Sequence, residues 1–163
     1  MTLQKRKHPR LKTFDYATPG AYFITICAYK RRALFGSIRP GNKPEDISCR
    51  LSVYGQCIRE LIQQLETKYP QAQIDHMVVM PNHIHLLITL KEASDADIPT
   101  MIGRFKSCAT RACWKLGYPE KQLFQTSFHD HVVRSETEYQ NIWEYIDTNP
   151  LKWALDRYYI PEQ

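Results

Sequence analysis

The chain of 163 residues carries a formal net charge of +5, with 43% hydrophobic and 24% charged residues. These values are ordinary for a globular protein and predict one domain over residues 1–163 with a sizeable core. The sequence also excludes a membrane-spanning helix, because no apolar run approaches the roughly 20 residues that a span needs. Five cysteines without a CxxC pair predict reduced thiols and a cytoplasmic protein.

The first half of the chain changes from a strand pattern to an irregular one and then to a helical one. Residues 21–29 are rich in β-branched and aromatic residues, which predicts a strand. Two glycines and two prolines within residues 34–51 predict a long loop or an irregular hairpin. Ser52 is a typical N-cap for a helix that reaches about residue 68, and Pro70 stops that helix.

The second half of the chain completes a recognisable order of elements. Five further segments are expected: strands at 74–80 and 83–90 around a Pro-Asn turn, a helix at 98–116, a strand at 127–134, and a last helix from Ser135. This order is the split βαβ pattern. It predicts an α+β, ferredoxin-like fold, in which a four-stranded antiparallel sheet carries helices on one face and an extra helix follows at the C-terminus.

Two histidines separated by one residue stand out in the strand expected at 83–90. Side chains alternate between the two faces of a strand, so His83 and His85 share one face and Ile84 points to the other. Two neutral imidazoles side by side can bind a divalent metal ion. By itself, a His-x-His pair is more often a pair of ordinary histidines on a half-buried strand.

The last helix carries a tyrosine and an asparagine one turn apart. Tyr145 lies about 60° from Ile142 on the flank of an apolar stripe, and Asn149 follows on the same flank. Pro150 predicts a helix break at Asn149. Taken singly, Tyr145 is typical of an exposed helix tyrosine and Asn149-Pro150 of a helix stop.

The basic residues gather in three clusters. They lie in an N-terminal tail at residues 1–13, after the first strand, and along the helix at 98–116. Their members are Lys5, Arg6, Lys7, Arg10 and Lys12 in the first, Lys30, Arg31 and Arg32 in the second, and Arg104, Lys106, Arg111 and Lys115 in the third. Such clusters suit nucleic acid, although a single cluster is more often a solvated face.

These motifs together resemble the HUH nucleases, and most closely their repeat-associated (REP-associated) tyrosine transposase branch. The resemblance covers about residues 14–155. It rests on four segments: Gly-Ala-Tyr-Phe-Ile-Thr-Ile at 20–26, Pro-Asn-His-Ile-His at 81–85, Phe-His-Asp-His-Val-Val-Arg at 128–134, and Tyr-Ile-Asp-Thr-Asn-Pro at 145–150.

The resemblance implies a role for each motif residue. His83 and His85 would be metal ligands, Tyr145 the nucleophile on a catalytic C-terminal helix, and Asn149 a third ligand where relatives often have glutamine. His131 matches a further histidine position of the branch and would be a ligand, a phosphate contact or a structural group. The family's activity implies cleavage and strand transfer of single-stranded DNA, with Mg²⁺ or Mn²⁺ and a 5′-phosphotyrosine intermediate.

The implied partners are single-stranded DNA with hairpin or palindromic repeats and, as in some relatives, a second copy of the chain. The alternative is a non-catalytic ferredoxin-like protein that binds single-stranded nucleic acid by stacking. A two-histidine phosphoesterase is less suitable, because it needs two His-x-Thr/Ser motifs. A histidine-triad hydrolase needs a third histidine where Leu87 stands.

Overall fold

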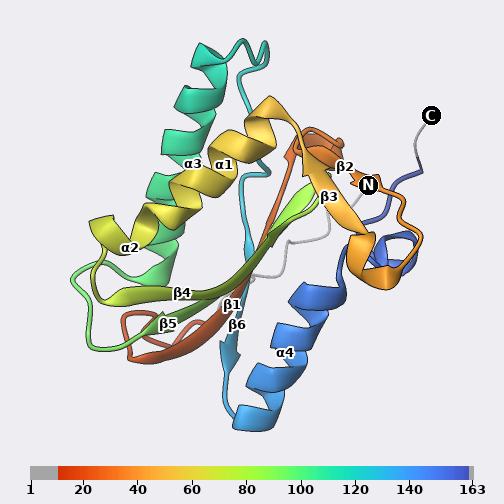
Figure 1. Cartoon of the computed structure of the whole chain (residues 1–163). Coiled ribbons are helices and arrows are strands. Elements are labelled where there is room, and N and C mark those ends of the chain that lie inside the picture. The colour runs from red at the N-terminus through yellow and green to blue at the C-terminus, as the bar shows by residue number, and fades with distance from the viewer. Residues whose placement is uncertain (1–10, 162–163) are drawn as a thin grey trace, which may run out of the picture.

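The computed structural model describes residues 11–161 and contains a four-stranded antiparallel sheet (Figure 1). Its strands are β1 (Gly20–Cys27), β4 (Ala72–Val79), β5 (His83–Leu90) and β6 (His129–Val133). They lie in the order β4-β5-β1-β6, so the two central strands are β5 and β1. The predicted ferredoxin-like α+β fold is confirmed.

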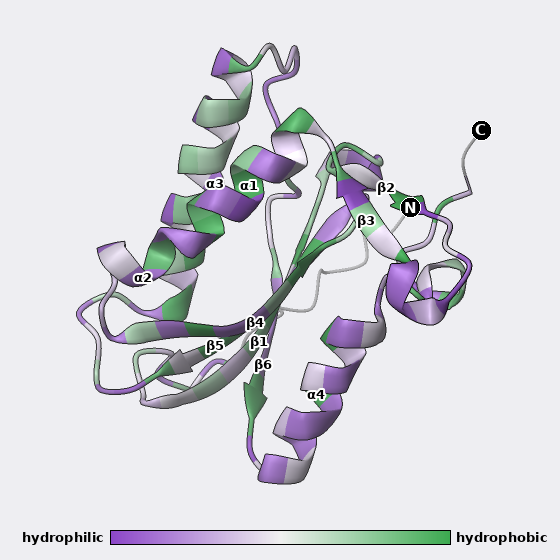
Figure 2. Cartoon of the chain, viewed as in Figure 1, coloured by the Kyte–Doolittle hydropathy of each residue, from purple (hydrophilic) through white to green (hydrophobic). Residues whose placement is uncertain are grey.

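The helices lie on opposite faces of this sheet (Figure 1). One face carries α1 (Val53–Gln63), α2 (Leu65–Lys68) and α3 (Ile98–Lys115), and the other carries α4 (Glu136–Thr148). Figure 2 shows α4 as largely hydrophilic. Within residues 11–161, no helix is long and apolar enough to cross a membrane.

The main core lies between the sheet and the first group of helices. Ile84 and Leu86 of β5 and Ile24 of β1 are fully buried there against Ile58 and Ile102. These strand residues alternate with the residues that face α4. Because one face of β5 is anchored in the core, the histidines between these apolar residues are forced onto the α4 face.

The N-terminus of each long helix is fixed by a side-chain cap. Ser52 accepts a hydrogen bond from Gly55 N (3.1 Å), Asp97 from Thr100 N (2.8 Å), and Ser135 from Glu138 N (3.1 Å). Such caps satisfy backbone donors that a helix leaves unpaired at its start. The caps therefore set where α1, α3 and α4 begin.

The structure differs from the sequence-based boundaries in the first half of the chain. Residues 34–51 form the hairpin rather than the long loop, with β2 (Gly36–Arg39) paired to β3 (Ser48–Leu51). The prolines and one glycine fall in the connection between these strands, where they leave the pairing intact. The helix expected over residues 52–68 breaks at Gln64, which separates α1 from α2.

Candidate active site

The histidine pair lies at the start of β5, on the sheet face that α4 covers. His83 and His85 have ring centroids 4.6 Å apart and are at most 1% exposed. In the register of the sheet, His83 stands opposite Cys27 and His85 opposite Thr25 of β1. Two imidazoles in contact and shielded from water form a preorganised pair of nitrogen donors.

The side chain of Asn82 determines which nitrogen of His83 carries its proton. The Asn82 amide nitrogen donates to the carbonyls of Arg31 (3.1 Å) and Tyr158 (2.8 Å), which fixes the orientation of the amide. Its oxygen must therefore accept from His83 Nδ1, at 2.8 Å. This leaves a lone pair on His83 Nε2, the tautomer that binds a metal ion.

His85 is held in a similar way. Its Nδ1 is hydrogen-bonded to Thr25 Oγ1 at 2.8 Å, and its buried Nε2 has no hydrogen-bond partner among the described residues. Burial lowers the pKa of His85 well below its usual range, and the neighbouring His83 lowers it further. Burial also lowers the pKa of His83, to about 4, with Asp156 acting in the opposite direction. Both rings are therefore neutral at pH 7.

Asp156 is the third donor of this cluster, and the sequence analysis missed it. Single ligand atoms of His83, His85 and Asp156 all lie within 4.8 Å of one another. Asp156 follows the short helix η3 (Trp153–Leu155), and its Oδ1 accepts from Tyr158 N at 2.7 Å. A lone aspartate after a predicted helix stop has no diagnostic spacing, so no sequence signal identified it.

Asn149 closes the cluster from the end of α4. It is the C-cap of that helix, at the break that Pro150 led us to expect, and its side chain is 2% exposed. Its Nδ2 donates to Asp156 Oδ2 at 2.8 Å, so its Oδ1 is the atom that lies 3.3 Å from His83 Nε2. Two lone pairs therefore face each other across this gap, an arrangement that a cation between them would stabilise.

Tyr145 reaches the same cluster from the flank of α4. Its ring centroid lies 5.2 Å from that of His85 and 6.1 Å from that of Phe23, and the side chain is 37% exposed. Burial raises the pKa of the Tyr145 phenol, and Asp156 raises it further, whereas Arg157 and a hydrogen bond with Asn149 lower it. One chain thus brings the tyrosine and both histidines together.

His131 is not part of the cluster. It lies on β6 opposite Phe23, with β1 between it and β5, and its Nε2 is paired with Glu138 Oε1 at 2.5 Å. The same carboxylate accepts from Arg134 N, which lies between β6 and α4. In this structure His131 therefore connects β6 to the first turn of α4.

The predicted basic residues have different environments. Lys30 and Arg31 both have positive φ angles (56° and 53°), and Arg31 lies over the Tyr158 ring, 5.4 Å from its centroid. Arg32 is paired with Glu120. Lys12 is exposed. The other predicted residues of the N-terminal tail, Lys5, Arg6, Lys7 and Arg10, lie outside the described residues.

The mixed nitrogen and oxygen donor set fits a divalent metal ion. Two neutral imidazole nitrogens, a carboxylate and an amide oxygen converge, and the buried Nε2 of His85 has no hydrogen-bond partner within residues 11–161. Ligands about 2.1 Å from an octahedral ion lie about 3.0 Å apart, close to the 3.3 Å between Asn149 Oδ1 and His83 Nε2.

A ferredoxin-like sheet with a histidine pair beneath a helix tyrosine is the arrangement that the resemblance to the single-tyrosine HUH class implied. The sequence model of the family described as "Transposase IS200 like" matches residues 21–149. The chain therefore belongs to the IS200-like transposase family, as the resemblance implied.

Individual relatives are similar to this chain over most of its length. The chain is 28% identical to an uncharacterised protein of Haemophilus influenzae, with 97% of this chain and 95% of that protein covered. It is 27% identical to the REP-associated tyrosine transposase of Escherichia coli K12, over 84% of this chain and 70% of that protein. A solved REP-associated tyrosine transposase bound to a REP hairpin shares the fold, with a TM-score of 0.62, 24% identity, and coverage of 88% of this chain and 73% of that one.

Proposed function

We propose that this chain cuts single-stranded DNA through a covalent bond to Tyr145 and rejoins the bound end to another strand. The observation that carries the proposal is the placement of the Tyr145 ring 5.2 Å from the His85 ring, beside the three-donor cluster of the same chain. The family assignment supports the class of reaction.

We propose that His83, His85 and Asp156 hold a divalent metal ion, Mg²⁺ or Mn²⁺, with Asn149 as a further ligand. When bound, such an ion would polarise a phosphate oxygen and offset the charge that develops on it. Asn82 and Thr25 would hold the two imidazoles in orientation through their Nδ1 atoms.

Tyr145 is proposed as the nucleophile. Its oxygen forms a bond to the scissile phosphorus as the bond to the 3′-oxygen breaks. The phenol loses its proton and the departing oxygen gains one, so the products are a 5′-phosphotyrosine and a 3′-hydroxyl. The phosphodiester energy is conserved in the new bond, so a second 3′-hydroxyl can reverse the step on another strand. Arg157 lies close enough to favour the ionised phenol, because it lowers the pKa of Tyr145.

The proposed substrate is single-stranded DNA flanked by hairpin or palindromic repeats. This follows from the family assignment and from the REP hairpin bound by the structural relative. The homodimer predicted from the sequence is not needed to complete the site, because Tyr145 meets the histidines of its own chain. The five free cysteines suit the proposed cytoplasmic location.

An adduct assay tests this function. The protein is incubated with Mn²⁺ and a 3′-labelled oligonucleotide that carries a hairpin beside a single-stranded segment, and the products are separated on a denaturing gel. We expect a protein–DNA adduct that disappears in Tyr145→Phe and persists in the control Tyr139→Phe on the same helix. DNA binding without an adduct in the unmodified protein would instead support the non-catalytic alternative.

A further inference from the structure

A groove of about 430 Å³ lies between α3 and the connection that follows it, away from the histidine cluster. In Figure 1 this connection runs back along α3 before it enters β6. The lining comprises Lys106, Ser107, Thr110, Arg111 and Trp114 of α3 together with residues 121–126. It includes three cationic side chains and no carboxylate. A hollow with this charge favours an anionic partner.

The two walls of the groove are tied together by hydrogen bonds. Lys106 Nζ donates to the carbonyls of Gln125 (2.6 Å) and Thr126 (3.0 Å). Trp114 Nε1 donates to the carbonyl of Glu120 at 2.8 Å. These bonds hold the connection against α3, so the groove is formed before any partner binds.

The surface of the groove combines exposed cations with an exposed aromatic ring. Arg111 and Lys121 are exposed and form no ion pair within residues 11–161. Trp114 is 45% exposed although its indole nitrogen is already bonded, so a ring surface remains open to solvent. Cations for phosphates and an aromatic ring for a base are the two elements of single-stranded nucleic-acid binding.

One wall of the groove, the connection after α3, is hydrogen-bonded to the active-site end of β1. Gln125 N donates to the carbonyl of Cys27 (2.9 Å), and Cys27 stands opposite His83 in the register of β1 and β5. On the other side, Ala28 N donates to the carbonyl of Asn82, also at 2.9 Å. Only the end of β1 therefore lies between residues 121–126, which line the groove, and Asn82, which orients His83.

We propose that this groove binds a stretch of single-stranded DNA that continues from the active site. Arg111 and Lys121 contact its phosphates, and Trp114 stacks on one of its bases. This inference rests on the proposed function, which supplies single-stranded DNA as the substrate. It gives a role to Lys106 and Arg111, two of the basic residues that recur along α3.

The inference is tested with fluorescein-labelled dT20, a single strand that forms no hairpin, by anisotropy between 50 and 200 mM NaCl. Each phosphate contact on a single strand steepens the logarithmic salt dependence by about 0.7. Replacing Arg111→Gln and Lys121→Gln together should reduce that slope by about 1.4 and weaken binding about 25-fold at 0.1 M salt. Trp114→Ala should weaken binding about fivefold or more, whereas Trp114→Phe should retain most of the affinity.

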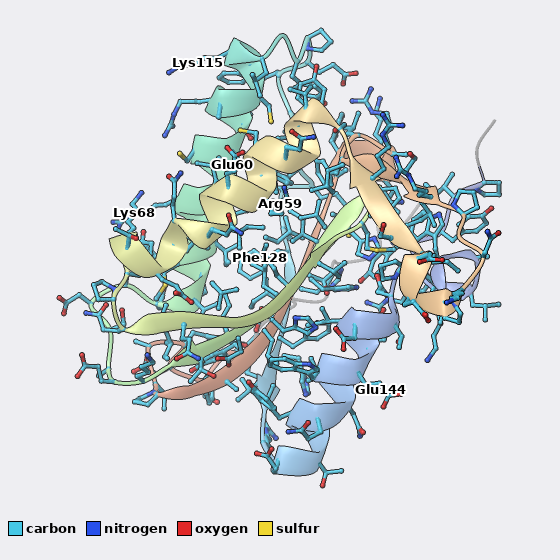
Figure 3. The ribbon with its side chains drawn as sticks, in the orientation of Figure 1. Arg59, Glu60, Lys68, Lys115, Phe128 and Glu144 are labelled. Carbon is cyan, nitrogen blue, oxygen red and sulfur yellow. The ribbon has the colours of Figure 1, made fainter. Side chains whose placement is uncertain are left out.

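The matched control is Arg59→Gln with Lys68→Gln, which removes the same charge from α1 and α2 (Figure 3). Neither residue lines the groove, so this pair should change the affinity for dT20 less than twofold. Equal affinities for dT20 in the groove pair and the control pair would overturn the inference. The adduct assay separates the two proposals: an adduct with unchanged dT20 binding refutes the groove alone, and weakened dT20 binding without any adduct refutes the proposed chemistry alone.

Discussion

Asn82→Ala is expected to damage both the stability of the protein and its metal affinity. Asn82 is 1% exposed and makes three hydrogen bonds, to the carbonyls of Arg31 and Tyr158 and to His83 Nδ1. Each bond contributes about 1 kcal/mol, and buried partners left unpaired add to the cost, so the free energy of unfolding should fall by about 3–5 kcal/mol. His83 would also lose the partner that fixes its tautomer, which should weaken Mn²⁺ binding about 10- to 100-fold.

The assays are urea unfolding for stability and titration calorimetry with Mn²⁺ for affinity. The control is Ile62→Ala, a fully buried position in the core on the opposite face of the sheet. It should cost a similar 2–5 kcal/mol. Its folded form should nevertheless bind Mn²⁺ as the unmodified protein does. A cost below about 1 kcal/mol for Asn82→Ala, or an unchanged Mn²⁺ affinity, would refute the role given to Asn82.

Three further outcomes follow from the cluster. Mn²⁺ at 100 times its dissociation constant should raise the free energy of unfolding by about 2.7 kcal/mol, and His83→Ala with His85→Ala should abolish the gain measured in urea. Asp156→Asn should weaken Mn²⁺ binding at least about tenfold by calorimetry, because a carboxylate is lost. The pKa of His83, about 4 when folded and about 6.5 when unfolded, means that the unfolded chain takes up the proton first as the pH falls. Stability should therefore drop by about 3 kcal/mol between pH 7 and pH 4, and urea unfolding of His83→Gln should lack this part of the dependence.

The sheet and the histidine pair could be anticipated because their signals are local. The alternation of Ile84 and Leu86 with His83 and His85 determines which face each side chain occupies, whatever the rest of the chain does. The N-caps of α1 and α4 were equally predictable, because Ser52 and Ser135 each accept a hydrogen bond from a backbone N–H only three residues further along the chain. Such features depend on the nearest neighbours in the sequence.

Asp156 could not be anticipated because tertiary contacts determine its position. The segment after Pro150 is drawn back over the site by the bond from Asn82 to the Tyr158 carbonyl, between residues 76 positions apart. The Tyr158 ring then packs against that of His83, with 4.6 Å between centroids and the ring planes tilted by 37°. Likewise, the pairing of Arg32 with Glu120 joins residues 88 positions apart. Motif spacing in the sequence does not predict contacts between residues so far apart along the chain.

The most direct test of the account is to map the covalent bond. The adduct formed with Mn²⁺ and a hairpin oligonucleotide is digested with nuclease and protease, and the modified peptide is sequenced by mass spectrometry. The account predicts a single nucleotide attached through its 5′-phosphate to Tyr145, within the α4 sequence. A nucleotide on another tyrosine, on His131, or on either histidine of the cluster would contradict it.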